Sequence, residues 1–147
     1  MIENTELLLK SIVSLQKKLQ GYLNENFKDY NLKSPEIITL HLLDKENLTQ
    51  VELAKLLKCD KSHIHRTITK LAEKGFIEFD DRTHNKNLKL SLTQQGKSIS
   101  QKIDENMKLW HEILFKGISE KDVELIKKIF NKFIENTKNI KTGGNNA

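Results

Sequence analysis

The residues best suited to chemistry lie on one face of a predicted helix between residues 61 and 74. Ile64, Ile68 and Leu71 recur there at steps of four and three, which predicts an inward apolar face. The opposite face carries short hydrogen-bonding side chains and cations and no carboxylate: Lys61, Ser62, His63, His65, Arg66, Thr69 and Lys70. Arginine can bond guanine through two hydrogen bonds, serine and threonine reach base edges or phosphates, and lysine pairs with phosphates. This inventory predicts a helix that reads the major groove of duplex DNA, with Ser62, Arg66 and Thr69 at the centre of its face. The alternative is an ordinary solvated helix.

The charge of the chain is compatible with a polyanionic partner. The 147 residues include 25 Lys plus Arg against 20 Asp plus Glu, a net charge of +5. Between residues 58 and 74, five basic side chains outnumber Asp60 and Glu73, which gives 5 − 2 = +3. Many basic proteins bind no nucleic acid, so the clustering of charge carries more weight than its total.

Local signals place this helix inside a compact unit. Ser34 is expected to cap a short apolar helix that has Pro35 at its first position. Thr49 and Glu52 form a predicted capping box for the next helix. Asp60 is expected to cap the helix from Lys61 to Lys74, and Gly75 to end it. Residues 76–79 and 88–92 then read as two strands joined by a polar loop. The order of helix, helix, helix and hairpin predicts a winged helix-turn-helix.

The loop of this hairpin, the wing, has a mixed character. It offers Arg82, His84 and Lys86, whose charge Asp80 and Asp81 largely cancel. A wing acts by placing a cation in or beside the minor groove. We expect Lys86 to do this first and Arg82 second; a solvated turn with internal ion pairs is the alternative.

Long amphipathic helices flank the unit. One covers residues 5–27. Thr93 is expected to cap a second, which is broken at Gly117, and Ser119 is expected to cap a third. Their apolar stripes have no evident partner within the chain, which favours burial against a second subunit. We expect a mainly α fold with a small β-hairpin, divided into an N-terminal dimerisation helix (1–33), a winged helix-turn-helix DNA-binding domain (34–93), C-terminal dimerisation helices (94–140) and a disordered tail (141–147).

Several function classes lack support in the sequence. Cys59 is the only cysteine, so no intramolecular disulfide can form, and no apolar stretch is long enough to span a membrane or resembles a signal peptide. We therefore expect a cytoplasmic protein. His63 and His65 point in different directions on a helix, and neither His41 nor His111 has a paired ligand, so no metal or other cofactor is expected. No catalytic motif is present.

Cys59 itself allows two interpretations. It lies between two predicted helices, where a small packed side chain is the ordinary outcome. Alternatively, Lys58 and Lys61 lower the pKa of its thiol and make it an oxidant sensor.

Taken together, four segments resemble the multiple-antibiotic-resistance regulator (MarR) family over residues 34–96. They are Leu53-Ala54-Lys55-Leu56-Leu57, Asp60-Lys61-Ser62, Glu73-Lys74-Gly75-Phe76-Ile77 and Leu90-Ser91-Leu92-Thr93-Gln94-Gln95-Gly96. The resemblance implies a homodimer whose first and last helices interlock and whose two recognition helices enter successive major grooves of a near-palindromic operator. It also implies transcriptional repression relieved by a small anionic or phenolic effector.

Two positions depart from the family pattern. Wings of this family carry Asp-x-Arg just before the second strand, and here those places read His84-Asn85-Lys86. Lysine lacks the planar fork of arginine, so we expect a weaker minor-groove contribution and more reliance on the helix. Cys59 does not lie where oxidant-responsive members carry their sensing cysteine. A winged-helix module that binds another protein, without binding DNA, is the alternative function.

Overall fold

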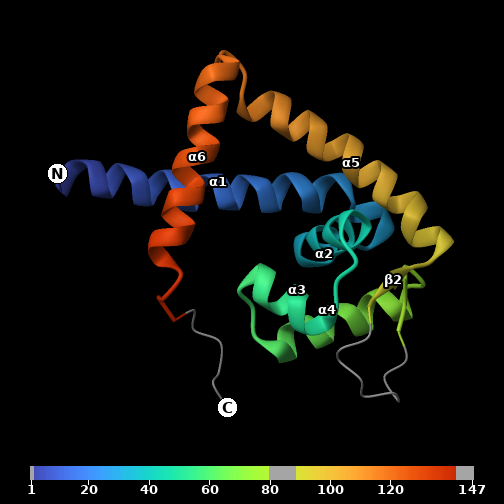
Figure 1. Cartoon of the computed structure of the whole chain (residues 1–147). Coiled ribbons are helices and arrows are strands. Elements are labelled where there is room, and N and C mark those ends of the chain that lie inside the picture. Colours follow the sequence, from blue (N-terminus) through green and yellow to red (C-terminus); the bar gives the residue numbers. More distant parts are fainter. Residues whose placement is uncertain (1, 80–88, 142–147) are drawn as a thin grey trace.

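The computed structural model describes residues 2–79 and 89–141 of the chain (Figure 1). Its elements, in order, are α1 (Ile2–Asn26), a 3-10 turn η1 (Lys28–Tyr30), α2 (Ser34–Lys45), α3 (Gln50–Leu57), α4 (Lys61–Glu73), β1 (Ile77–Glu78), β2 (Ser91–Leu92), α5 (Gln94–Leu114) and α6 (Glu120–Thr137). The predicted mainly α fold with a small β-hairpin is confirmed. The wing residues Arg82, His84 and Lys86 lie outside the described residues.

The two strands pair antiparallel, with Ile77 opposite Leu92 and Glu78 opposite Ser91. Both are shorter than the segments predicted from their alternating pattern. In the second segment only residues 91–92 pair with β1. The residues before them pair with the chain ahead of α3: Leu90 donates its N–H to the carbonyl of Leu48 at 2.9 Å, and Lys89 forms a bridge with Thr49. The chain just before α3 is therefore joined to the base of the hairpin.

Helices α2, α3 and α4 and the two strands form one lobe, which is built around a hydrophobic core. It contains the predicted inward residues of α4, Ile64, Ile68 and Leu71, all buried. It also includes Leu23 from α1 and Phe27 just after it, and Ile99 and Ile103 from α5. The flanking helices thus supply part of the core on which this lobe is built.

Most predicted helix caps are confirmed. Thr49 and Glu52 form the complete capping box, and the side chains of Asp60, Thr93 and Ser119 each accept the backbone N–H three residues ahead. The expected cap at Ser34 is wrong. Ser34 is the first helical residue, and its N–H is accepted by the Asn24 side chain from α1 at 2.8 Å.

The start of α5 is packed tightly on the turn that follows α4. Gly75 ends α4 with a positive φ of 83°, as predicted. Thr93 donates its hydroxyl to the Gly75 carbonyl at 2.6 Å, and its N–H to the Phe76 carbonyl at 3.0 Å. A Cβ built on Gly96 would overlap that same Phe76 carbonyl. This explains why a threonine and a glycine stand three residues apart here.

The three long helices extend well beyond the lobe, and α6 turns back after α5 (Figure 1). The described part of α6 has no buried residue. Large apolar side chains remain exposed along α1, the second half of α5 and α6: Leu7, Leu8, Leu9, Ile12, Val13, Leu15, Leu109, Ile113, Leu114, Leu125, Ile129, Phe130, Phe133 and Ile134. Among the described residues, no helix has the length and apolar character that crossing a bilayer requires.

Candidate nucleic-acid interface

The surface under consideration is the exposed face of α4, and its position is set by α3. The two helices pack together. Lys58 ends α3 in the left-handed conformation with φ 55°, and the Cys59 N–H reaches back to the Ala54 carbonyl at 3.1 Å. Asp60 then begins α4. This short connection fixes the angle at which α4 leaves α3, as a helix-turn-helix requires.

The residues predicted to read DNA divide into two groups by exposure. Lys61, Ser62, Arg66 and Lys70 are exposed, whereas His63, His65 and Thr69 are half-buried. The exposed group lies on the side of α4 opposite its buried apolar residues. The structure therefore brings the Ser62 hydroxyl, the Arg66 guanidinium and the Lys70 ammonium to one open face, with Lys61 exposed beside it in the first turn.

The hydroxyls of α4 all donate toward the protein. Ser62 donates to Oδ1 of Asp60 at 2.7 Å. Thr67, which is buried, donates to the His63 carbonyl at 3.0 Å, and Thr69 donates to the His65 carbonyl at 2.8 Å. Donors that remain on the exposed face are consequently cationic.

Asp60 is more than a helix cap. Its Oδ1 accepts both the His63 N–H at 2.6 Å and the Ser62 hydroxyl. These two hydrogen bonds, the backbone one first, hold the pKa of the Asp60 carboxyl below its usual value, with a smaller contribution from the charge of Arg66. The group is thus kept ionised beside the first turn of α4.

His65 is oriented toward the hairpin. Its ring meets Phe79 edge-on, with centroids 5.8 Å apart and planes at 79°. The sequence pattern placed this histidine at the shoulder of the reading face and contained no signal for the aromatic partner, because Phe79 lies beyond α4 in the chain. The half-buried ring helps to seat the hairpin against α4.

Lys74 is half-buried, with a side chain 24% exposed, and does not belong to the open cationic face. Its ammonium pairs with the Glu36 carboxylate and with the Asn31 carbonyl, both at 2.5 Å. Glu36 is buried, with a side chain 9% exposed. Counting Lys74 toward a DNA-facing charge therefore overstates that charge, and the open cations of this region are those of Lys58, Lys61, Arg66 and Lys70.

The base of the hairpin is held by an ion pair that sequence reasoning missed. Lys89 binds Glu52 of α3, with its Nζ 3.0 Å from Oε1. The hydrogen bond from Lys89, followed by that from the Thr49 backbone, lowers the pKa of Glu52. Glu52 therefore caps α3 and also binds the segment that leads into β2.

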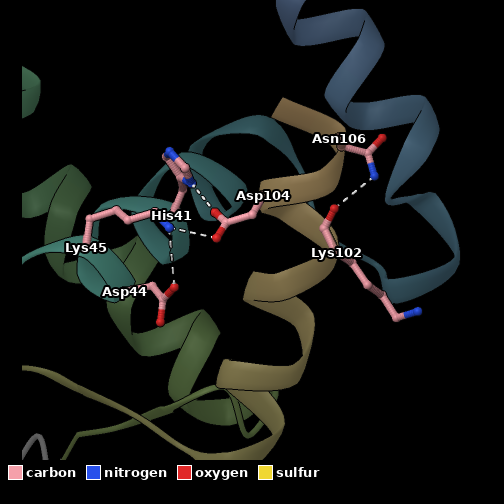
Figure 2. Close-up of polar contacts among 6 residues, drawn as sticks. All are labelled: His41, Asp44, Lys45, Lys102, Asp104 and Asn106. Atoms are coloured by element: carbon pink, nitrogen blue, oxygen red, sulfur yellow. Dashed lines mark hydrogen bonds and ion pairs between the residues drawn. The ribbon is translucent and has the colours of Figure 1, made fainter. Parts of the chain in front are cut away.

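A second cluster joins the lobe to α5. Figure 2 shows Asp104 of α5 directed at two side chains of α2. Its Oδ1 lies 3.1 Å from Nδ1 of His41, and its Oδ2 lies 2.7 Å from Nζ of Lys45. Asp44 is a more distant neighbour of Lys45, at 3.9 Å. These contacts fix the lobe on the helix that leads out of it.

The oxidant-sensor interpretation of Cys59 is wrong in its premise. Burial raises the pKa of the Cys59 thiol, and the nearby charge of Asp60 raises it further. The nearby lysines do not reverse this, so the thiol stays protonated and packs against the core. Within residues 2–79 and 89–141, no cluster of three His, Cys, Asp or Glu could hold a metal ion.

Comparison with known proteins identifies what this arrangement resembles. Residues 33–87 match the model of the MarR family. Over 131 residues the chain is 25% identical to an uncharacterized HTH-type transcriptional regulator, YybA, of Bacillus subtilis (strain 168), a match that covers 88% of this chain and 87% of that protein.

Solved structures share the whole architecture. A MarR protein from Peptoclostridium difficile DA00132 superposes with a TM-score of 0.81 at 21% identity, covering 90% of this chain and 88% of that one. A MarR family transcriptional regulator from Listeria monocytogenes, solved in complex with a 26mer DNA, gives a TM-score of 0.80 at 23% identity and covers 95% of this chain and 97% of that one. The flanking helices are therefore part of the shared fold.

Proposed function

We propose that this chain, which matches the MarR family model over residues 33–87, is a transcriptional regulator of that family that binds duplex DNA in a sequence-specific manner through α4. The observation that carries the proposal is the exposed face of α4, where Arg66 stands between Ser62 and Lys70 on the second helix of a helix-turn-helix. Helices of this kind enter the major groove and contact base edges with their N-terminal residues. A Listeria regulator of the same fold was solved in complex with a 26mer DNA, which supports duplex DNA as the partner.

We propose that the functional unit is a homodimer. The exposed apolar side chains of α1, α6 and the end of α5 form a larger surface than a lone soluble chain usually exposes. A dimer would present two α4 helices to half-sites about 10 bp apart in a near-palindromic operator. Residues 1–33 and 94–140 would then serve dimerisation, and residues 34–93 DNA binding.

We further propose that the dimer represses transcription and is released by a small-molecule effector, as is typical of the family. In the wing, Lys86 is our first candidate for the minor-groove cation, with Arg82 and His84 beside it. Such a protein acts on the chromosome, so we place it in the cytoplasm and assign it no enzymatic activity.

The experiment that tests this function begins with selection of duplexes from a random-sequence pool. Arg66→Ala is expected to weaken binding to the selected duplex by about 1–3 kcal/mol and to relax specificity at the base pair it reads. Fluorescence anisotropy at fixed salt, with single-base variants of the duplex, measures both effects. Lys127→Ala is the matched control, because Lys127 is an exposed cation of α6 that pairs only with Glu124 three residues away.

Two results would contradict the proposal. If Arg66→Ala binds the selected duplex as tightly as the parent protein, α4 does not read DNA. If the parent protein enriches no duplex at all, the alternative of a protein-interaction module is favoured.

A further inference from the structure

The first turn of α4 contains a hydroxyl whose hydrogen is already committed. An ionised carboxylate can only accept hydrogen bonds, so the 2.7 Å contact between Ser62 and Asp60 has one direction, with Ser62 as donor. A hydroxyl has one hydrogen and two lone pairs. The exposed Ser62 side chain can therefore offer only its lone pairs to a ligand in front of it.

Resting on the proposed function, we propose that Ser62 is a specificity residue that reads an amino group, N4 of cytosine or N6 of adenine, in the major groove. These two amino groups are the only hydrogen-bond donors that bases display there. Guanine offers O6 and N7, and thymine offers O4, all of them acceptors. A hydroxyl that can only accept would leave those atoms unpaired, so the residue discriminates against guanine and thymine.

Asp60 is the positioning residue for this hydroxyl. Hydrogen bonds to an ionised group are roughly twice as strong as those between neutral groups, so turning the Ser62 hydrogen outward carries a substantial cost. The N–H of His63 holds the same carboxylate oxygen at 2.6 Å, which fixes it in place. Thr69 differs, since it donates to a neutral backbone carbonyl and its hydrogen is more easily released.

The neighbouring Arg66 supplies the complementary half of the pattern. It lies one helical turn further along the same exposed face, roughly 6 Å along the axis for four residues. Base pairs are about 3.4 Å apart along the duplex. The expected half-site thus contains a guanine read by Arg66 and, about two base steps or fewer away, a cytosine or adenine whose amino group Ser62 contacts. Because every base pair contains one of these two bases, the contact is defined by the strand as well as by the position.

Base analogues that lack a single amino group test the proposal directly. A selected duplex carries 2′-deoxynebularine in place of the adenine, or 2-pyrimidinone in place of the cytosine, at each position in turn. At one position, losing the amino group is expected to weaken the parent protein by about three- to tenfold, the worth of one hydrogen bond. Ser62→Ala is expected to lose almost nothing there, and comparing both proteins on the same duplex cancels any change in the DNA itself.

A second experiment tests the part played by Asp60. In Asp60→Ala the hydroxyl is free to donate, so repeated selection is expected to admit guanine or thymine at the position read by Ser62. Ser119→Ala is the matched control, because it removes the same kind of helix cap from α6. Circular dichroism checks that α4 still forms, and Asp60→Asn, which retains a capping oxygen without the charge, is used if it does not.

Different outcomes contradict the role of Ser62 and the proposed DNA binding. If removal of no single adenine or cytosine amino group weakens binding by the parent protein, the proposal is overturned. It is also overturned if the analogue weakens Ser62→Ala as much as the parent, or if Asp60→Ala keeps the restriction to adenine and cytosine. Failure of the parent to enrich any duplex overturns the proposed function, and this inference with it.

Discussion

Gly96 occupies a point where α5 begins directly against the chain that follows α4. The Phe76 carbonyl fills the space that a side chain at Gly96 would need, and it also accepts the Thr93 N–H at 3.0 Å. Neither helix can shift without breaking that bond. The missing side chain is therefore a condition for joining α5 to the DNA-binding lobe.

We expect Gly96→Ala to lower the free energy of unfolding by about 2–3 kcal/mol, because overpacking against backbone cannot be relieved by a rotamer change. Gly21→Ala is the control. Gly21 is exposed within α1, with no atom within 4 Å of an added Cβ, so alanine there should stabilise the helix by about 0.5–1 kcal/mol. Urea denaturation followed by circular dichroism measures both, and equal stability of the two variants would contradict the account.

At this scale the sequence is informative wherever an interaction is local. The caps formed by Thr49, Asp60 and Thr93 were predicted correctly because each donor lies three residues from its acceptor. Ser34 was not, because its N–H is accepted by Asn24 from another helix. Similarly, no spacing rule links Lys74 to Glu36, so an interior ion pair looked like surface charge.

At the scale of elements, α4 is held at both ends by side chains. Asp60 caps its N-terminus, and at its C-terminus Lys74 reaches the buried Glu36 near the start of α2. The second contact is structural, and the cations of α4 that face outward are different residues. Stability and DNA binding should therefore respond separately to substitutions along this helix.

Lys74→Met should lower the free energy of unfolding by about 2 kcal/mol, since it leaves the Glu36 carboxylate buried without its cation. It should leave the salt dependence of DNA affinity unchanged. Lys70→Met, which removes an exposed cation, should do the reverse and reduce the slope of log affinity against log salt by about one. Denaturation and salt titration of both variants test this, and a reduced slope for Lys74→Met would show that Lys74 contacts phosphate.

The helices themselves were predictable from apolar periodicity and caps, but the strands were less so. Leu90 fits the alternating pattern of the hairpin, yet it pairs with Leu48 instead of with β1. A strand's pattern specifies which face is buried and does not name the partner strand. The ion pair of Lys89 with Glu52 stabilises the pairing of this segment with the chain before α3. It joins residues far apart in the sequence, so no rule of local spacing predicts it.

For the whole molecule, the main feature left unexplained by a single chain is the apolar surface exposed on the long helices. α6 buries none of its described residues, and Phe130 and Phe133 are exposed on it. The amphipathic stripes in the sequence indicated that a partner was needed. They could not indicate that one half of α5 is buried and the other exposed. Ile99 and Ile103 lie in the core, whereas Ile113 and Leu114 are exposed.

Phe130→Glu should dissociate the proposed dimer at micromolar concentration, because an unpaired carboxylate buried in its apolar interface would cost several kcal/mol. Leu56→Glu is the control, because Leu56 of α3 is as exposed as Phe130, at 49% against 50%, but lies on the DNA-binding lobe. Sedimentation velocity gives the oligomeric state. If both variants sediment like the parent protein, α6 is not part of the interface.

The division of α5 has a mechanical consequence. Its 21 residues make a rod roughly 30 Å long, with one end embedded in the lobe and the other among the exposed apolar side chains. Tilting such a rod by about 5° moves its far end by roughly 3 Å, close to the rise of one base pair. Asp104 lies near the middle of the rod, where it grips His41 and Lys45 of α2. In the proposed dimer, a change in the angle of α5 would therefore shift the lobe by about one base pair, and the contacts of Asp104 with His41 and Lys45 hold α5 against α2.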